Sequence, residues 1–183
     1  MNEIFFDSLN KNIIKLEKES DLAGIIITSA KKTFLAGADL DIFYKQNDPN
    51  GCLDFIENGK KIMRRLELIG KPIVAAVNGT ALGGGMELTL CCHRRIVIDS
   101  PNSKFGFPEV NFGLLPGGGG ITRLSRLIGI EKALPFLMEG KQVSAKDAVD
   151  AGLMDELAIS FEEMIDIAEK WIINNQGFQQ PWD

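Results

Sequence analysis

The sequence has few of the residues on which metal sites and histidine-dependent catalysis are built. Its 183 residues include one histidine, His93, and three cysteines, Cys52, Cys91 and Cys92. Three cysteines make no disulfide framework, and adjacent cysteines lack the spacing of zinc ligands. A histidine-dependent triad or a multi-histidine metal site would have to be built around one residue. If the chain is an acid–base enzyme, carboxylates are therefore the expected proton carriers.

Long apolar runs and excess positive charge are also missing. No apolar stretch reaches the length of a transmembrane helix, and the N-terminus lacks a basic segment followed by an apolar one. The formal net charge of -5 argues against non-specific nucleic-acid binding. Neither GxxxxGK[ST] nor a GxGxxG after a strand occurs, so no phosphate loop or NAD site is predicted. With 45% hydrophobic residues, we expect one globular domain in the cytoplasm.

Apolar spacing predicts strands that alternate with helices. We expect helices at about 1–20, 52–68, 84–93, 119–128 and 130–139, and strands at 24–28, 73–77 and 95–98. The second helix has Leu53, Ile56, Met63 and Leu66 on one face. This alternation predicts an α/β layered fold.

Two capping-box patterns predict further helices near the C-terminus. Ser144 is followed three residues later by Asp147, and Ser160 by Glu163. A serine at the N-cap accepts a hydrogen bond from the backbone N–H three residues later, and an acidic side chain at that position can accept one from the backbone N–H of the serine. We expect one helix to begin after each serine.

The segment VNGTALGGGMEL places Gly83, Gly84 and Gly85 just before Glu87. A helix N-terminus presents unpaired N–H groups and a partial positive charge, which suit an anion or a polarised carbonyl oxygen. Glycines let a ligand approach such donors closely. A carboxylate in the first turn is also favourable for structural reasons alone, so both interpretations of Glu87 stay open.

A second candidate is FLAGADL, Phe34 to Leu40. Its Ala-Gly-Ala core can bend sharply and offer free backbone N–H groups. The alternative is an ordinary turn with Asp39 as a helix cap.

The third candidate is Glu109, which follows a proline in FGFPEVNFGLLPGGGG. It lies in apolar company, with Phe105, Phe107, Val110 and Phe112 nearby. If these residues bury the carboxyl group, its pKa rises and it stays available as an acid. The alternatives are a solvent-facing glutamate and a glycine run that is only a packing loop. Together, the three segments suit a reaction that passes through an oxyanion, with proton transfer by two carboxylic acids. They do not by themselves identify the reaction.

Four segments, taken together, resemble the successive signatures of the crotonase (enoyl-CoA hydratase/isomerase) superfamily. They are KTFLAGADL, KPIVAAVNGTALGGGMEL, FGFPEVNFGLLPGGGG with TRL, and GKQVSAKDAVDAGLMDEL. They occur in the family's order and cover residues 24–157. The step from Glu87 to Glu109 and the CCHRR segment are most similar to the hydratase domain of bacterial multifunctional fatty-acid oxidation complex α-subunits. The resemblance implies the α/β crotonase-like core, a spiral of ββα repeats.

The resemblance also implies roles for single residues. The backbone N–H groups of Ala38 and Gly84 would form the oxyanion hole for a thioester carbonyl. Glu109 would donate a proton to Cα of a trans-2-enoyl thioester, and Glu87 would orient and activate the water that adds to Cβ. The positions implied for substrate and CoA binding are Leu35, Ala36, Gly37, Asp39, Leu40, Gly83 and Gly85.

The implied activity is enoyl-CoA hydration in fatty-acid β-oxidation, with Δ3-Δ2 isomerisation as a second activity of the same pair. No metal and no redox cofactor are implied, because coenzyme A is part of the substrate. The implied partners are acyl-CoA or enoyl-CoA thioesters, further copies in a trimer-based assembly, or a β-oxidation complex.

Family domains normally begin with strands and end with helices that this sequence does not show. We therefore expect residues 1–183 to form a single crotonase-like domain, a truncated portion of a larger protein. Two alternatives stay open. One is a non-catalytic module that binds acyl-CoA or partner subunits, and the other is a family member with a different reaction.

Overall fold

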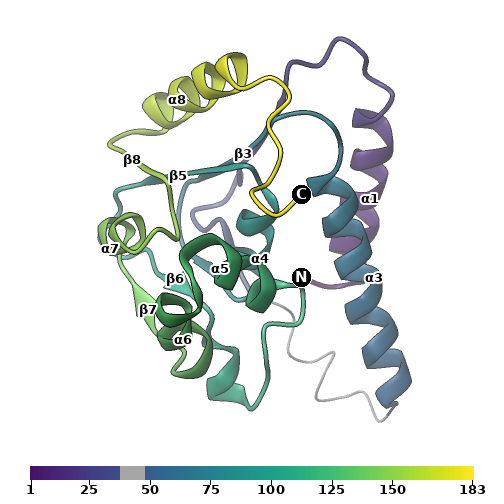
Figure 1. Cartoon of the computed structure of the whole chain (residues 1–183), viewed down its shortest axis with the longest axis vertical. Coiled ribbons are helices and arrows are strands. Elements are labelled where there is room, and N and C mark those ends of the chain that lie inside the picture. The colour runs from purple at the N-terminus through teal and green to yellow at the C-terminus, as the bar shows by residue number, and fades with distance from the viewer. Residues whose placement is uncertain (38–47) are drawn as a thin grey trace.

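Two four-stranded sheets form the framework of the computed structural model, which describes residues 1–37 and 48–183 (Figure 1). The first sheet is parallel throughout, in the order β1 (Ile25–Ile27), β3 (Ile73–Val77), β5 (Arg94–Ile98) and β8 (Glu156–Ala158). The second has the order β2 (Leu35–Ala36), β4 (Ala81–Leu82), β6 (Phe105–Gly106) and β7 (Gln142–Val143), with only β7 antiparallel. The predicted α/β layering is confirmed.

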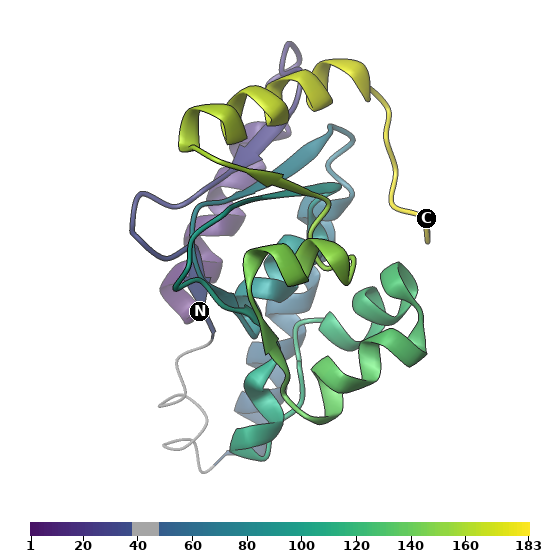
Figure 2. The same ribbon diagram turned by 90° about the vertical axis from the view of Figure 1, so that its left-hand side faces the viewer.

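The first sheet is covered on both faces, which explains why every residue of β3 is buried. Val74 and Ala76 pack in one apolar cluster with Met164 and Ala168 of helix α8 (Phe161–Asn174). Figure 2 shows α8 lying across the strands on that side. The alternate residues of β3 point into the larger core on the opposite face.

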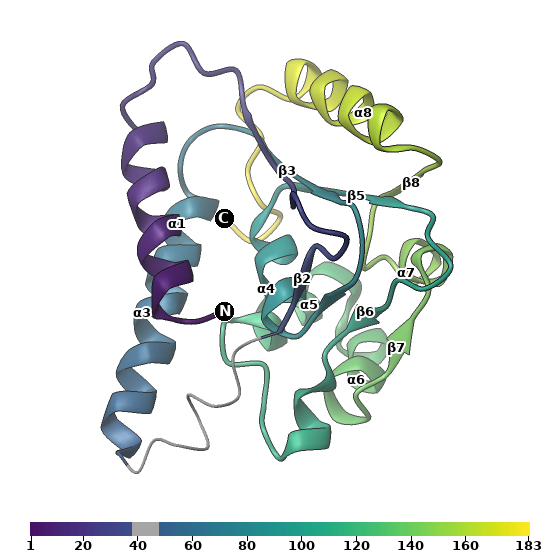
Figure 3. The same cartoon turned by 180° about the vertical axis from the view of Figure 1, so that it is seen from behind.

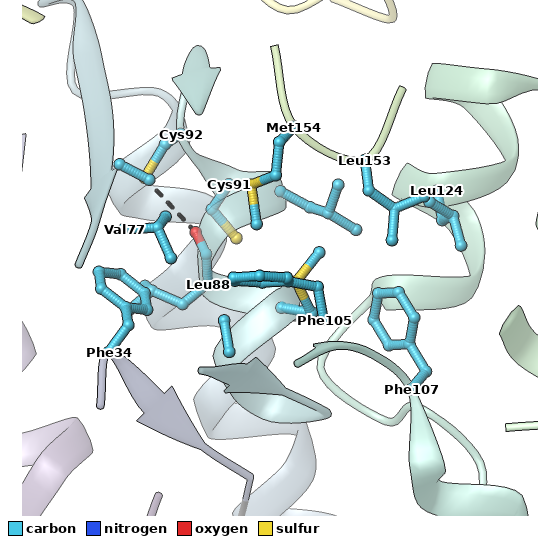
Figure 4. Packing of buried hydrophobic residues seen from close by; sticks show 14 of the residues in the cluster. Phe34, Val77, Leu88, Cys91, Cys92, Phe105, Phe107, Leu124, Leu153 and Met154 are labelled. Carbon is cyan, nitrogen blue, oxygen red and sulfur yellow. Dashed lines mark hydrogen bonds between the residues drawn. The ribbon is translucent and has the colours of Figure 1, made fainter. Parts of the chain in front are cut away.

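Helix α4 (Gly84–Cys91) lies at the centre of the larger core, and all eight of its residues are buried. A helix that is apolar all round is expected in such a position. Figure 4 shows Phe105 beside Leu88 of this helix and Phe107 nearer to Leu124. The glutamate in α4 is therefore a buried carboxylate in an apolar helix.

The long helices α1 (Glu3–Leu16) and α3 (Pro49–Glu67) lie side by side along one flank (Figure 3). Phe6 of α1 packs edge-on against Phe55, with ring centroids 5.5 Å apart. A Cβ at Gly59 would lie 2.7 Å from Phe6, so this glycine allows the two helices to approach. The predicted apolar face of α3 is wrong at Leu53, which is 56% exposed.

The remaining helices are the 3-10 helix η1 (Pro108–Phe112), α5 (Gly120–Ile128), α6 (Ile130–Met138) and α7 (Ala145–Asp150). Of these, α5, α6 and α7 lie close to their predicted positions, and η1 was not predicted. Both predicted serine N-caps are confirmed, although neither acidic residue accepts from the backbone N–H of its serine: Asp147 accepts from the Ser144 hydroxyl and Glu163 from the Ile159 N–H. The Ser144 hydroxyl accepts from the Asp147 N–H and the Ser160 hydroxyl from the Glu163 N–H. In the described part of the chain, no helix is long and apolar enough to cross a membrane.

Candidate active site

A cavity of about 630 Å³ opens at the carboxyl edge of the second sheet. Because β2, β4 and β6 are parallel, the residues that follow them meet at this edge. Gly37 follows β2, Gly83 follows β4, and Glu109 lies three residues after β6. The small sheet thus brings together all three places that the sequence marked as candidates.

The glycine run at the start of α4 gives the cavity an accessible helix N-terminus. Gly83 has φ +52°, which favours glycine, and its N–H donates to the carbonyl oxygen of Gly106 at 2.9 Å. Gly84 is the first helical residue, so its N–H has no acceptor within the helix. Both residues line the cavity. The predicted oxyanion donor Gly84 therefore lies where a bound carbonyl oxygen can reach it.

Glu87 reaches the cavity from the first turn of α4 although it is only 5% exposed. Its Oε1 accepts a hydrogen bond from the Gly120 N–H at 2.8 Å. Burial raises the pKa of this carboxyl group, while bonds from the N–H groups of Gly120 and Gly118 and the charge of Arg123 act to lower it. The glycine run before α5 therefore does more than fill a packing loop, because it holds the carboxylate.

Glu109 faces the same cavity from η1, in a different environment. Its Oε2 is buried, and no residue in the described ranges donates a hydrogen bond to it. Burial raises its pKa to about 7, with a smaller contribution in the same direction from Glu87. A Cβ on Gly83 would lie 2.5 Å from Oε1 of Glu109, so the third candidate packs directly against the second.

The two carboxyl groups therefore share one cavity but are suited to different tasks. Glu87 is held in one orientation by backbone donors, as a group that positions a water molecule needs to be. Glu109 has a pKa of about 7, so a large share of its side chains carry the proton that a general acid needs at neutral pH. Burial raises the pKa of both groups, but only Glu87 also has two backbone N–H donors from the glycine loop and a nearby arginine charge that favour its ionised form.

The other predicted binding residues fall into three groups. Ala36 and Gly37 line the cavity together with Gly83. Leu35 and Gly85 do not line it but contact each other, since a Cβ on Gly85 would collide with the Leu35 carbonyl oxygen. The remaining predicted residues, Ala38, Asp39 and Leu40, lie outside the described residues.

The single histidine serves the fold and does not line the cavity. The N–H of Ile73 donates to Nδ1 of His93 at 3.1 Å, so the ring proton is on Nε2 and faces the Glu67 carbonyl oxygen at 3.2 Å. Burial lowers the pKa of this imidazole, which keeps it neutral. His93 thus joins β3 to the end of α3.

Sequence reasoning missed two charged residues behind the site, Glu67 and Arg123. Both are buried, and they form an ion pair with an N–O distance of 2.9 Å. They lie 56 positions apart on different helices, so no local pattern links them. One signal in the sequence could have indicated them. In each predicted helix, the spacing of apolar residues places this charged residue on the apolar face.

Comparisons with known proteins find relatives of this chain. A family model described as enoyl-CoA hydratase/isomerase matches residues 1–176. The chain is 41% identical over 146 residues to the fatty acid oxidation complex subunit alpha of Shewanella loihica, covering 79% of this chain and 21% of that protein. The chain thus spans about a fifth of the length of that relative.

Solved structures share the fold. An enoyl-CoA hydratase from Thermoplasma volcanium aligns with a TM-score of 0.88 and 31% identity over 94% of this chain and 68% of its own. One from Bacillus anthracis aligns with a TM-score of 0.85 and 32% identity over 96% of this chain and 68% of its own. The crotonase-like fold expected from the motifs is confirmed.

Proposed function

We propose that this chain, which belongs to the enoyl-CoA hydratase/isomerase (crotonase) family, adds water across the trans-2 double bond of enoyl-CoA thioesters. The observation that carries the proposal is the pair of carboxyl groups, Glu87 and Glu109, in one cavity beside a helix N-terminus. Hydration needs one group to activate water and another to deliver a proton. The contrasting environments of these two side chains supply both.

The thioester carbonyl oxygen would bind at the N–H of Gly84. Negative charge develops on this oxygen as the hydroxide adds, and a preorganised donor at a helix N-terminus stabilises it. Removing one such donor typically costs on the order of 10²–10³ in rate. Ala38, which the family resemblance assigns as the second donor, lies outside the described residues and remains a prediction.

Proton transfer would run through the two glutamates. Glu87 takes a proton from water while the resulting hydroxide bonds to Cβ, and Glu109 gives its proton to Cα as the double bond is lost. The pKa of about 7 means that Glu109 holds a proton for a large share of the time at neutral pH. Exchange with solvent then returns both groups to their starting protonation states.

The remainder of the cavity suits an apolar acyl chain. Its wall beyond the glutamates is formed largely by apolar side chains, among them Phe6, Phe55, Ile56 and Met63 from the two flanking helices. Phe112, Leu114 and Leu115, from the segment NFGLL, complete this lining. An apolar wall with a few polar groups at one end is the usual form of a site for such a ligand.

The wider context is part of the proposal. Similarity to a fatty acid oxidation complex subunit supports a role in cytoplasmic β-oxidation, within a larger complex or a trimer-based assembly. Neither a metal nor a redox cofactor is needed for the proposed proton transfers. The same glutamate pair also suits Δ3-Δ2 isomerisation, in which a proton is moved between carbons.

The test is the ultraviolet absorbance of crotonyl-CoA after the purified chain is added. Hydration removes the conjugated double bond, so the absorbance falls to an equilibrium value. Glu87→Gln and Glu109→Gln should each lower the rate by at least about 10²-fold while the protein stays folded. Hydration that persists in either variant would exclude that residue from the proposed role. Acyl-CoA binding without any turnover in the wild-type chain would favour the non-catalytic binding module instead.

A further inference from the structure

Glu67, at the end of α3, is the centre of a buried polar network behind the cavity. It is 3% exposed, and its carboxylate accepts four hydrogen bonds. Oε1 accepts from Arg123 Nε at 3.1 Å and from the Trp182 indole at 3.2 Å. Oε2 accepts from Arg123 at 2.9 Å and from Arg64 at 2.7 Å. Neither Glu67 nor Arg123 lines the cavity.

Arg123 extends this network into the glycine loop 117–120. Its third nitrogen donates to the carbonyl oxygen of Gly118 at 3.1 Å. Gly119 has φ +105°, and a Cβ there would collide with the Arg123 guanidinium. Gly120 then donates its N–H to Glu87 at 2.8 Å. The arginine therefore contacts the backbone of the same short loop that holds the first carboxylate.

We propose that Glu67 and Arg123 form a positioning pair that fixes the glycine loop against Glu87 and so sets the orientation of that carboxylate in the cavity. The proposal rests on the proposed function in so far as an oriented Glu87 is needed for hydration. The contact between the loop and Glu87 is a structural feature that can be measured without turnover.

The energetics favour a role beyond holding the fold together. A buried ion pair loses hydration on folding, and well-packed apolar residues of the same volume are often as stabilising or more so. An apolar pair cannot donate to the Gly118 carbonyl oxygen, whereas a guanidinium does so while two of its other nitrogens hold Glu67. The geometry therefore assigns to Arg123 a task that only its forked guanidinium performs, with Glu67 orienting the fork.

The C-terminal segment takes part in this network. Besides the Trp182 indole on Glu67, the amide of Gln180 donates to the Cys92 carbonyl oxygen at 3.1 Å, just after α4 ends. Asp183 pairs with Arg64, which also bonds Glu67. Residues at the C-terminal end of the chain, which do not line the cavity, thus help to hold the positioning pair.

The first experiment compares Arg123→Lys with the matched control Arg95→Lys. Arg95 is also buried and pairs with Asp155 at 2.8 Å, but it lies on β5, away from the glycine loop. Arg123→Lys keeps the positive charge but loses the planar guanidinium that contacts both Glu67 and Gly118. We expect kcat for crotonyl-CoA to fall at least about tenfold with KM within about threefold, because a displaced catalytic group costs rate more than substrate contact. Arg95→Lys should keep kcat within about twofold.

The pH dependence of kcat/KM gives a second readout. The ionisable groups that act on Glu87 are Glu109 from η1, Arg123 from α5 and the Cys91 thiol from α4 itself. Weaker N–H bonds to Glu87 would raise its pKa, so the acid limb of the profile should move to higher pH in Arg123→Lys. The limb should stay in place in Arg95→Lys.

The third readout needs no turnover. Gly120 begins α5, so its N–H has no acceptor within that helix and is held by Glu87. Its hydrogen exchange should become at least about tenfold faster in Arg123→Lys and stay unchanged in Arg95→Lys, at pH values where both proteins are folded. If Arg123→Lys does not fold, Trp182→Phe removes one donor to Glu67 while keeping a ring, and the same shift in exchange is expected at a smaller size.

The results separate the two proposals. Faster Gly120 exchange supports the positioning pair even if the wild-type chain does not hydrate crotonyl-CoA, in which case only the proposed function fails. Unchanged Gly120 exchange in Arg123→Lys or Trp182→Phe overturns the positioning pair. A kcat loss in Arg123→Lys that Arg95→Lys reproduces would also overturn it, because the loss would then follow from general destabilisation.

Discussion

The substitution Glu109→Gln should make the protein more stable at alkaline pH while removing a group proposed for catalysis. The folded-state pKa of Glu109 is about 7, against an ordinary value of 4.5. Because the folded-state value is the higher one, the folded protein binds this proton more tightly than the unfolded chain. The resulting stability is fully present below about pH 4.5 and is lost as the pH rises to about 7.

The magnitude follows from the same pKa values. One pKa unit corresponds to about 1.36 kcal/mol, so the full difference corresponds to about 3 kcal/mol. The Glu109 side chain is only partly buried and solvent screens part of this cost, so we expect about 1–3 kcal/mol. Glutamine is neutral at every pH, so the variant does not lose this stability as the pH rises. The free energy of unfolding of Glu109→Gln, relative to wild type, should therefore rise by this amount between pH 4.5 and pH 8.

Urea unfolding at a series of pH values measures this difference. Glu57→Gln is a suitable control, because the Glu57 side chain is 44% exposed and its neighbour Lys60 lowers its pKa. Because its titration lies at and below pH 4.5, the stability difference of Glu57→Gln from wild type should change little between pH 4.5 and 8. If the Glu109→Gln and wild-type curves run parallel from pH 4.5 to 8, the carboxyl group is not buried as described and its proposed role as a proton donor loses its basis.

Three further predictions concern single positions. Gly83→Ala should lower crotonyl-CoA hydration at least about tenfold, because its Cβ would lie 2.5 Å from Glu109 Oε1 and φ is +52°; wild-type kinetics would show that the site has room. Ser160→Ala removes the N-cap of α8 and should cost about 1 kcal/mol in urea unfolding without changing turnover; a loss of turnover in the folded protein would contradict this. Of the three thiols, Cys52 should react fastest with a thiol reagent in the native protein, because burial raises the pKa of the two adjacent cysteines that end α4; rapid reaction of all three would contradict it.

Much of the fold could be predicted because its signals are local. The Ser144 and Ser160 caps act within three residues, and the apolar run of β3 marks a buried strand whatever packs on it. The second sheet could not be predicted in this way, since each of its strands has two residues, too few to show alternation. Only the assembled structure shows that these short strands bring the site together.

The two glutamates of the candidate site could be predicted from the sequence, but the residues that hold them in place could not. Glu87 and Glu109 stood out because each lies beside glycine or proline in an apolar segment. The task of Gly120 could not be seen, because its partner Glu87 lies 33 positions away on α4. Gly118 accepts from Arg123, only five residues further on, but Arg123 is placed by its ion pair with Glu67, 56 positions away. Contacts between residues far apart in sequence leave no periodic signal in the chain.

The most direct test of the central claim is to identify the product formed from crotonyl-CoA in heavy-oxygen water and in deuterium oxide, by mass spectrometry. Hydration by Glu87 and Glu109 predicts a 3-hydroxyacyl thioester that carries the solvent oxygen at Cβ and a solvent deuteron at Cα. Both labels should be lost in Glu109→Gln. Recovery of unlabelled crotonyl-CoA alone, with no hydrated product, from the wild-type chain would contradict the account, as would deuterium at carbon without any solvent oxygen.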